Sequence, residues 1–370
     1  MLGRACLLFA VILTVACGPA EEIFVGEISA PVVYGTDDRR EVFAHPDPEL
    51  QRVARESIVA LIQTTRLNRL EDGSYSISAF SLKDEQGLCD DELFANQPVA
   101  ASCSGTLIDD DLVLTAGHCI SPQRPCDRFS YVFNYYLEGP SQLAPIQDED
   151  VYRCERVFLE RDAKIDEVTP DYVVIQLDRP VEGLHAPADV RPASPLEQDA
   201  PLSMIGFGSG LPAKIDSGAS VADPRTQEHD FFIANLDAFE GHSGSATFDS
   251  NAQLAGILIG GRVPDYVVAP DEDCARVNVF RDSEAGEVVH DISTIVKALC
   301  DEGWERGTLC ETAACVGDWC GTTSPPGNGG GVVPGDPSGC SVTASGSGAF
   351  SLWAGLFLWI AVGRLRRRAA

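Results

Sequence analysis

Three residues of this sequence could together perform nucleophilic catalysis. His118 lies in the stretch Thr115–Cys119 and Ser243 in the stretch Gly241–Ser245. A serine hydroxyl is a weak nucleophile at its free pKa, so an imidazole must take its proton and a carboxylate must hold that imidazole in one tautomer. Asp171 is the candidate carboxylate, with Asp166 and Asp178 nearby. The chemistry that this set predicts is acyl transfer through a covalent intermediate.

Short apolar runs must position these residues, because few segments of the chain have a helical period. Gly, Pro, Asp and Ser separate the runs, as is typical of strands and turns. The runs are 57–62, 104–108, 112–115, 131–135, 172–177, 202–207, 231–234, 245–248 and 254–259. One segment, 290–299, places Ile292, Ile295, Val296 and Leu299 on one helical face. The pattern predicts an all-β barrel or sandwich that ends in a C-terminal helix.

The stretch from Cys103 through Cys119, Cys-Ser-Gly-Thr-Leu-Ile followed by Thr-Ala-Gly-His-Cys, resembles the trypsin/chymotrypsin-fold serine endopeptidases. The chain order His118, Asp171, Ser243 is also that of the family. The resemblance covers residues 32–300. It implies an all-β fold of two antiparallel six-stranded Greek-key barrels with a C-terminal helix and the three residues in the cleft between the barrels.

Further details of a site follow from this resemblance. It implies a disulfide between Cys103 and Cys119, and a weaker expectation pairs Cys126 with Cys154. It favours Asp171 because the family's aspartate is followed by an apolar strand. It also implies an oxyanion hole made by the backbone N–H groups of Gly241 and Ser243, which would stabilise the tetrahedral intermediate.

Two motifs resemble the bacterial glutamyl-endopeptidase branch of the family. They are Gly-Thr-Asp-Asp-Arg at 35–39 and the serine motif, which ends in Gly-Ser rather than Gly-Gly. Trypsin carries an aspartate just before the nucleophile, which pairs with the new N-terminus on activation. His242 stands there in this chain, so we expect that salt-bridge switch to be unavailable.

The substrate pocket is expected around four residues: Asp237, Leu258, Gly260 and Gly261. Leu258 takes the place of the histidine that glutamate-specific relatives carry, so we expect substrates with glutamate before the scissile bond to be poor. Asp237 has two interpretations. It occupies the place of trypsin's specificity aspartate, which would favour Arg or Lys, or it is a loop carboxylate bonded to backbone N–H groups.

Composition excludes some classes of partner. The formal net charge of -29 argues against nucleic acid, because phosphate binding needs a basic face. The 13 cysteines show no CxxC spacing and the histidines no His-x-His spacing, so they indicate an oxidising compartment and disulfides rather than a metal site. No cofactor and no catalytic metal is expected, and the partners are protein or peptide substrates.

The two ends of the chain predict export and anchoring. Residues 1–17 predict a signal peptide, and the segment ending at Cys17 resembles an imperfect lipobox, which leaves lipidation and ordinary cleavage both open. Residues 18–31 are a pro-segment or linker, with maturation expected close to Val32 or Val33. Residues 301–339 form a Cys-rich and then Gly/Pro-rich linker.

The final segment, 340–370, is an apolar stretch followed by arginines at 364 and 366–368. It is either an ordinary membrane anchor or a sorting signal that resembles the MYXO-CTERM tail. The second interpretation implies a processing peptidase acting near Cys340. The sequence therefore predicts a secreted protein of the bacterial envelope, facing outward and anchored at the surface.

Three hypotheses for function follow. The first is an active serine endopeptidase, and the second is a catalytically inactive binding module on the same fold, motivated by His242 and by Ser245-Ala246. The third, an α/β-hydrolase, is rejected because its nucleophile motif needs glycine where Ser245 stands and its residue order is Ser, Asp, His.

Overall fold

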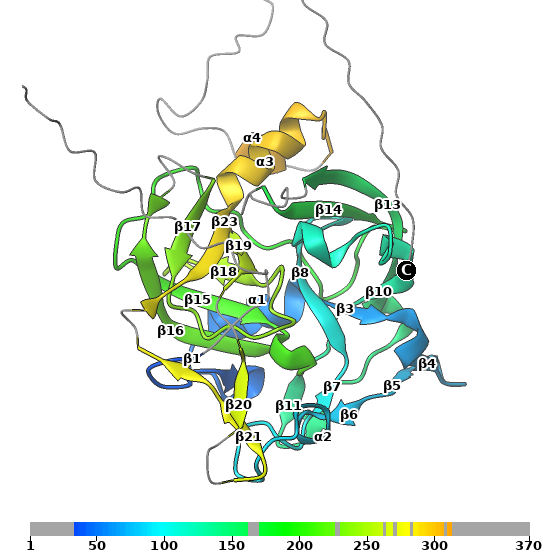
Figure 1. Ribbon diagram of the computed structural model, residues 1–370. Helices are drawn as coiled ribbons and strands as arrows, with labels where there is room; N and C mark the ends of the chain where they lie inside the picture. The colour runs from blue at the N-terminus through cyan, green and yellow to red at the C-terminus, as the bar shows by residue number, and fades with distance from the viewer. Residues whose placement is uncertain are drawn as a thin grey trace, which may run out of the picture. The chain divides into compact units, whose positions relative to one another are not determined.

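The computed structural model describes residues 33–161, 170–225, 230–261, 264–268, 272–281, 284–306 and 309–312. These residues form two antiparallel barrels with connecting segments and helices around them (Figure 1). The segments 1–32 and 313–370 lie outside the described residues, and with them the predicted signal, pro-segment and anchor. Of the predicted linker, 301–339, only residues 301–306 and 309–312 are described. Among the described residues, no helix is long and apolar enough to cross a membrane.

The first barrel is a closed sheet of six strands in the order β10-β13-β14-β9-β8-β3. Its strands are β3 (Ile58–Gln63), β8 (Ala101–Asp109), β9 (Leu112–Thr115), β10 (Phe129–Val132), β13 (Val151–Arg161) and β14 (Tyr172–Leu177). The runs at β3, β9 and β14 are apolar and buried over nearly their whole length. Such runs fit a barrel whose interior is filled by side chains and whose exterior packs against other parts of the chain.

The second barrel repeats this order of pairing. Its strands are β15 (Pro201–Gly206), β16 (Lys214–Asp223), β17 (Phe231–Ala234), β18 (Ala246–Phe248), β19 (Leu254–Gly260) and β23 (Glu287–Asp291). The order β15-β18-β19-β23-β17-β16 is closed by pairing between β15 and β16, and β2 (Arg40–Glu41) adds to β16. In each barrel the first strand pairs with the second and fourth, and the third with the sixth. The predicted all-β fold of two six-stranded Greek-key barrels is therefore confirmed.

The helices lie outside the barrels. They are α1 (Pro48–Glu56), α2 (Leu82–Gln86), α3 (Ile292–Asp301) and α4 (Leu309–Thr312). The helix expected over 290–299 begins two residues later, because Asp291 caps it by accepting a hydrogen bond from the N–H of Ser293 and His290 belongs to β23. The four predicted apolar positions of α3 are buried, and the helix follows the second barrel as expected.

The described residues also form small two-stranded sheets that are separate from the barrels. Between β3 and β8 the chain forms β4 (Leu67–Arg69) with β5 (Tyr75–Ile77), and β6 (Phe80–Ser81) with β7 (Pro98–Val99). The others pair β11 (Leu137–Gly139) with β12 (Gln142–Leu143), β20 (Tyr266–Val268) with β21 (Ala275–Val277), and β1 (Val33–Tyr34) with β22 (Val279–Phe280). One continuous hydrophobic core includes residues of both barrels, such as Leu107 and Ile257. This shared core allows side chains from both barrels to meet in one site.

Candidate active site

The structure brings His118, Asp171 and Ser243 together. His118 lies in a 3₁₀ turn directly after β9, Asp171 directly before β14, and Ser243 in the turn before β18. Nδ1 of His118 is 2.7 Å from Oδ2 of Asp171, and Nε2 of His118 is 2.7 Å from Oγ of Ser243. Both barrels therefore contribute to one hydrogen-bonded line from carboxylate to imidazole to hydroxyl.

Asp171 holds both the side chain and the main chain of the histidine. Its Oδ1 accepts a hydrogen bond of 2.9 Å from the backbone N–H of His118, while its Oδ2 faces the ring. Because an ionised carboxylate only accepts hydrogen bonds, Nδ1 carries the proton and Nε2 is left to accept from the serine hydroxyl. Of the other two aspartates, Asp178 accepts instead from the N–H of Arg153, and Asp166 lies outside the described residues.

The disulfide between Cys103 and Cys119 fastens the histidine turn to β8. This is the pairing that the resemblance implied, and the structure also contains a disulfide between Cys126 and Cys154. Two further bridges, Cys89–Cys274 and Cys300–Cys310, had not been predicted as pairs.

The serine turn depends on two glycines in left-handed conformation. Gly241 has φ +97° and Gly244 has φ +82°, and a Cβ on either would lie within 2.7 Å of a backbone oxygen. Only glycine adopts this backbone without strain. Within the described part of the chain, no acceptor pairs with the N–H of Gly241 or of Ser243. Two such free donors beside the serine hydroxyl can bind an oxyanion.

Ser104 is a residue of this site that the sequence analysis did not single out. It lies on β8 of the first barrel and is fully buried. Its Oγ donates to the carbonyl of Gly241 at 2.8 Å, and its N–H donates to the carbonyl of Ser243 at 2.9 Å. Ser104 therefore ties the serine turn of the second barrel to the first. Its only sequence signal is its place next to Cys103.

His242 is buried and stabilises the turn from inside. Its Nδ1 accepts a hydrogen bond of 3.0 Å from the N–H of Phe239, and its own N–H donates to the carbonyl of Phe239 at 2.8 Å. Burial lowers the pKa of the ring to about 3, helped by the charges of Arg39 and Lys214. The imidazole is therefore neutral at pH 7, and the turn needs no ion pair at this position.

Asp237 is bonded to the N-terminal segment. Its Oδ1 accepts from the N–H of Tyr34 at 2.8 Å and its Oδ2 from the N–H of Asp38 at 2.9 Å. Burial, with the nearby charge of Asp216, raises the pKa of Asp237 to about 8. These hydrogen bonds are those expected of a loop carboxylate bonded to backbone N–H groups, the second of its two interpretations.

The other expected pocket residues lie on or next to β19. Leu258 is fully buried in the core of the second barrel with Phe232 and Val289. Gly260 pairs with β23, and a Cβ on Gly261 would lie 2.9 Å from Oε1 of Glu287. The carboxylate beside this predicted pocket edge is thus Glu287, which the sequence analysis did not identify.

An open pocket of about 260 Å³ adjoins the serine turn. Gly241 and Glu240 form one side, and residues of the first barrel and of the 64–100 segment form the other. It is lined by Arg66, Glu85, Gln86, Val99, Ala100, Ala101, Ser102, Arg124, Ser209, Gly210, Glu240 and Gly241. Because Gly241 lines it, this pocket is close enough to the candidate oxyanion donor to hold part of a substrate near the reacting bond.

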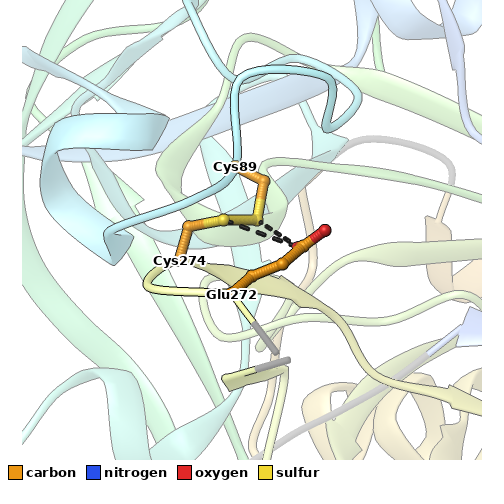
Figure 2. Close-up of side chains that lie close together, drawn as sticks. All are labelled: Cys89, Glu272 and Cys274. Carbon is orange, nitrogen blue, oxygen red and sulfur yellow. Dashed lines mark hydrogen bonds between the residues drawn. A yellow bond between two sulfur atoms is a disulfide. The ribbon is translucent and has the colours of Figure 1, made fainter. Parts of the chain in front are cut away.

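Cys89, Glu272 and Cys274 are a further group of potential metal ligands, and Figure 2 shows their close approach. The two sulfur atoms are joined in a disulfide. A metal would need thiolates, so the bonded sulfurs are not ligands in this state. The group is a cross-link between the 64–100 segment and the β20–β21 hairpin.

Comparison with known proteins agrees with the fold. Residues 103–257 match the model of the trypsin-like peptidase domain. Snake venom serine proteinase 5 of Crotalus adamanteus is 33% identical over 113 residues, which are 30% of this chain and 40% of that protein. Venom plasminogen activator LV-PA of Lachesis muta muta is 32% identical over 114 residues, 30% of this chain and 41% of that protein.

The chain thus spans about two fifths of the length of the curated relatives it matches. Among solved structures, Glu endopeptidase in complex with MPD is similar, with a TM-score of 0.45 and 15% identity, over 74% of this chain and 100% of that one. Residues 103–257, which include strands of both barrels, are thus similar to the trypsin-like peptidase domain.

Proposed function

We propose that this protein is a serine endopeptidase in which Ser243 is the nucleophile, His118 the general base and acid, and Asp171 the residue that orients His118. One observation carries the proposal: the two 2.7 Å contacts of His118, one to the carboxylate and one to the hydroxyl. A nucleophile bonded to a base that is bonded to a third group is the arrangement required for an activated serine.

In the proposed reaction, Oγ of Ser243 attacks the scissile carbonyl while its proton passes to Nε2 of His118. The imidazolium that forms is stabilised by Asp171, which stays ionised. The carbonyl oxygen becomes an oxyanion beside the N–H groups of Gly241 and Ser243. His118 then gives its proton to the leaving amine, and a water molecule hydrolyses the acyl-enzyme by the same steps.

Substrate preference before the scissile bond is proposed from the residues of β19. Leu258 is apolar and buried, so it offers nothing to a glutamate side chain, and we expect glutamate there to be poor. We do not assign Asp237 to the substrate, because both of its oxygens are bonded to the backbone of the 34–38 segment.

We further propose that the protein acts outside the cytoplasm, on protein or peptide substrates. Support comes from the four disulfides of the described residues, which persist in oxidising compartments. Attachment through residues 340–370, and processing near Cys340, remain proposals based on the sequence of that segment.

The inactive binding module has less support. His242, which motivated it, occupies a buried position where its ring accepts a hydrogen bond from the turn. Ser245, the other unusual residue, has a fully buried side chain that lies beside Gly206 and away from solvent.

A fluorophosphonate probe tests the proposed function, because only an activated serine is labelled. The wild-type chain should be labelled and should cleave casein, while Ser243→Ala and His118→Ala should do neither. Ser245→Ala is the matched control, since it removes a neighbouring buried hydroxyl and should keep labelling. Equal labelling of wild type and Ser243→Ala would show that another residue is the nucleophile, and no labelling of the wild type would favour the binding module.

A further inference from the structure

The peptide bond between Glu240 and Gly241 decides whether the candidate oxyanion hole exists. A trans peptide is planar, so its C=O and N–H point in opposite directions. If the carbonyl of Glu240 faced the serine, the N–H of Gly241 would face away and one oxyanion donor would be lost. Whatever fixes the carbonyl of Glu240 therefore fixes the donor.

Two hydrogen bonds fix the groups of Glu240. Its carbonyl accepts from the N–H of Ser209 at 2.5 Å, and its N–H donates to Oδ2 of Asp265 at 2.8 Å. The preceding carbonyl, of Phe239, accepts from the N–H of His242. The Phe239–Glu240 peptide is therefore held at both its C=O and its N–H, and the Glu240–Gly241 peptide is held at its C=O.

The bonds to Glu240 depend on two consecutive residues of one hairpin. Asp265 accepts the N–H of Glu240 directly. Tyr266 acts through Ser209, since the two hydroxyls are 2.7 Å apart and Ser209 has the unusual φ of 53°. The ring of Tyr266 also packs against Phe239, with centroids 5.6 Å apart. A non-glycine residue with positive φ needs such support from its surroundings.

The β20–β21 hairpin is covalently joined to the 64–100 segment, which lies between β3 and β8 in the chain. The Cys89–Cys274 disulfide joins the two, as Figure 2 shows. The backbone adds hydrogen bonds from Cys89 to Ala275 and from Ala275 to Gly87, of 3.0 and 2.9 Å. Arg276 contacts Asp91 and Glu92 at 3.0 Å. The hairpin is thus anchored through Cys274 and β21, while Tyr266 of β20 contacts Phe239.

We propose that Asp265 and Tyr266 are positioning residues for the oxyanion hole: Asp265 holds the Phe239–Glu240 peptide, and Tyr266, through Ser209, holds the Glu240–Gly241 peptide, so that the N–H of Gly241 faces Ser243. This inference rests on the proposed function. It also gives a way to fix the conformation of the serine turn in a chain where His242 stands in place of the aspartate that pairs with the N-terminus in trypsin. Asp265 needs only an acceptor oxygen for this task, so an amide at the same place should serve nearly as well.

The test compares Asp265→Ala with Asp265→Asn, and Tyr266→Phe with wild type. Loss of an oxyanion donor costs about 10²–10³ in kcat, so loosening one should cost less. We expect Asp265→Ala to lower the fluorophosphonate labelling rate and the kcat on a casein-derived peptide about 10- to 100-fold, with little change in KM. Asp265→Asn should stay within about threefold, and Tyr266→Phe, which keeps the ring, should lose about three- to tenfold.

Hydrogen exchange of the peptide that contains residues 239–243 is a second measurement, which does not depend on activity. Exchange of the Glu240 amide should be faster in Asp265→Ala than in Asp265→Asn. The inference is overturned if the wild type is labelled while Asp265→Ala matches it in labelling and in exchange, or if Asp265→Ala and Asp265→Asn lose kcat equally. Failure of the proposed function differs, because then the wild type itself is not labelled.

Discussion

The buried imidazole of His242 makes a prediction about stability that can be worked out in detail. The perturbation is His242→Ala, compared with His242→Asn. Alanine removes the ring and leaves the N–H of Phe239 without its acceptor. Asparagine places an amide oxygen close to the position of Nδ1, so it can keep that hydrogen bond while losing part of the ring.

The magnitude follows from two losses. An unsatisfied buried N–H costs about 1–3 kcal/mol, and a large-to-small change at a fully buried site costs about 2–4 kcal/mol for a side chain of this size. His242 is 1% exposed, so both apply. We expect His242→Ala to lower the free energy of unfolding by about 3–7 kcal/mol and His242→Asn by about 1–2 kcal/mol.

The contribution of His242 to the free energy of unfolding should also depend on pH. Burial lowers the pKa of His242 to about 3, whereas an unfolded histidine titrates near 6.5. Between these values the unfolded state binds one more proton, so the stability from the neutral ring is complete above about pH 6.5 and is lost as pH falls toward 3. The advantage of wild type over His242→Asn in unfolding free energy should therefore fall by about 1 kcal/mol per pH unit in that window and change sign before pH 4.

Urea unfolding at pH 7, 6, 5 and 4 measures these quantities. All variants should carry Ser243→Ala, because active protein would digest its own unfolded chains. The reasoning is refuted if His242→Asn destabilises as much as His242→Ala at pH 7. It is also refuted if the free-energy difference between wild type and His242→Asn is the same at pH 7 and pH 4.

Three further predictions concern activity and pH. Asp171→Asn should lower kcat on casein about 10³- to 10⁴-fold, because the amide no longer sets the tautomer of His118; a loss below tenfold would contradict that role. A peptide library should yield few cleavages after glutamate because Leu258 is apolar and buried, and glutamate as the preferred residue would refute this. Burial, with the nearby charges of Asp38 and Asp37, raises the pKa of Asp216 to about 6, and burial, with the charge of Asp216, raises the pKa of Asp237 to about 8, while unfolded carboxyls titrate near 4. The folded state then holds more protons between about pH 4 and 8, so this pair should make stability fall as pH rises there, and Asp237→Asn should reduce the slope in urea unfolding; an unchanged slope would count against it.

Much of the fold could be predicted because local patterns reflect burial. Nine of the twelve barrel strands coincide with apolar runs of the sequence, from β3 to β19. The three that were missed are β13, β16 and β23. β13 and β16 have exposed or half-buried positions within them, and polar residues such as Glu155 and Ser217 interrupt their apolar pattern. A strand with a solvated face alternates apolar and polar residues and therefore lacks the continuous apolar run that marks a strand buried on both faces.

The sequence by itself determined the residue types at the centre of the site, since His118 and Ser243 each lie in a motif a few residues long. Tertiary structure decided what surrounds them. Asp237 is bonded to Tyr34, Ser104 to Gly241, and Asp265 to Glu240. The first two pairs are separated by 203 and 137 residues. Such contacts form only once the two barrels have closed and packed, because the local sequence around one partner does not specify the other.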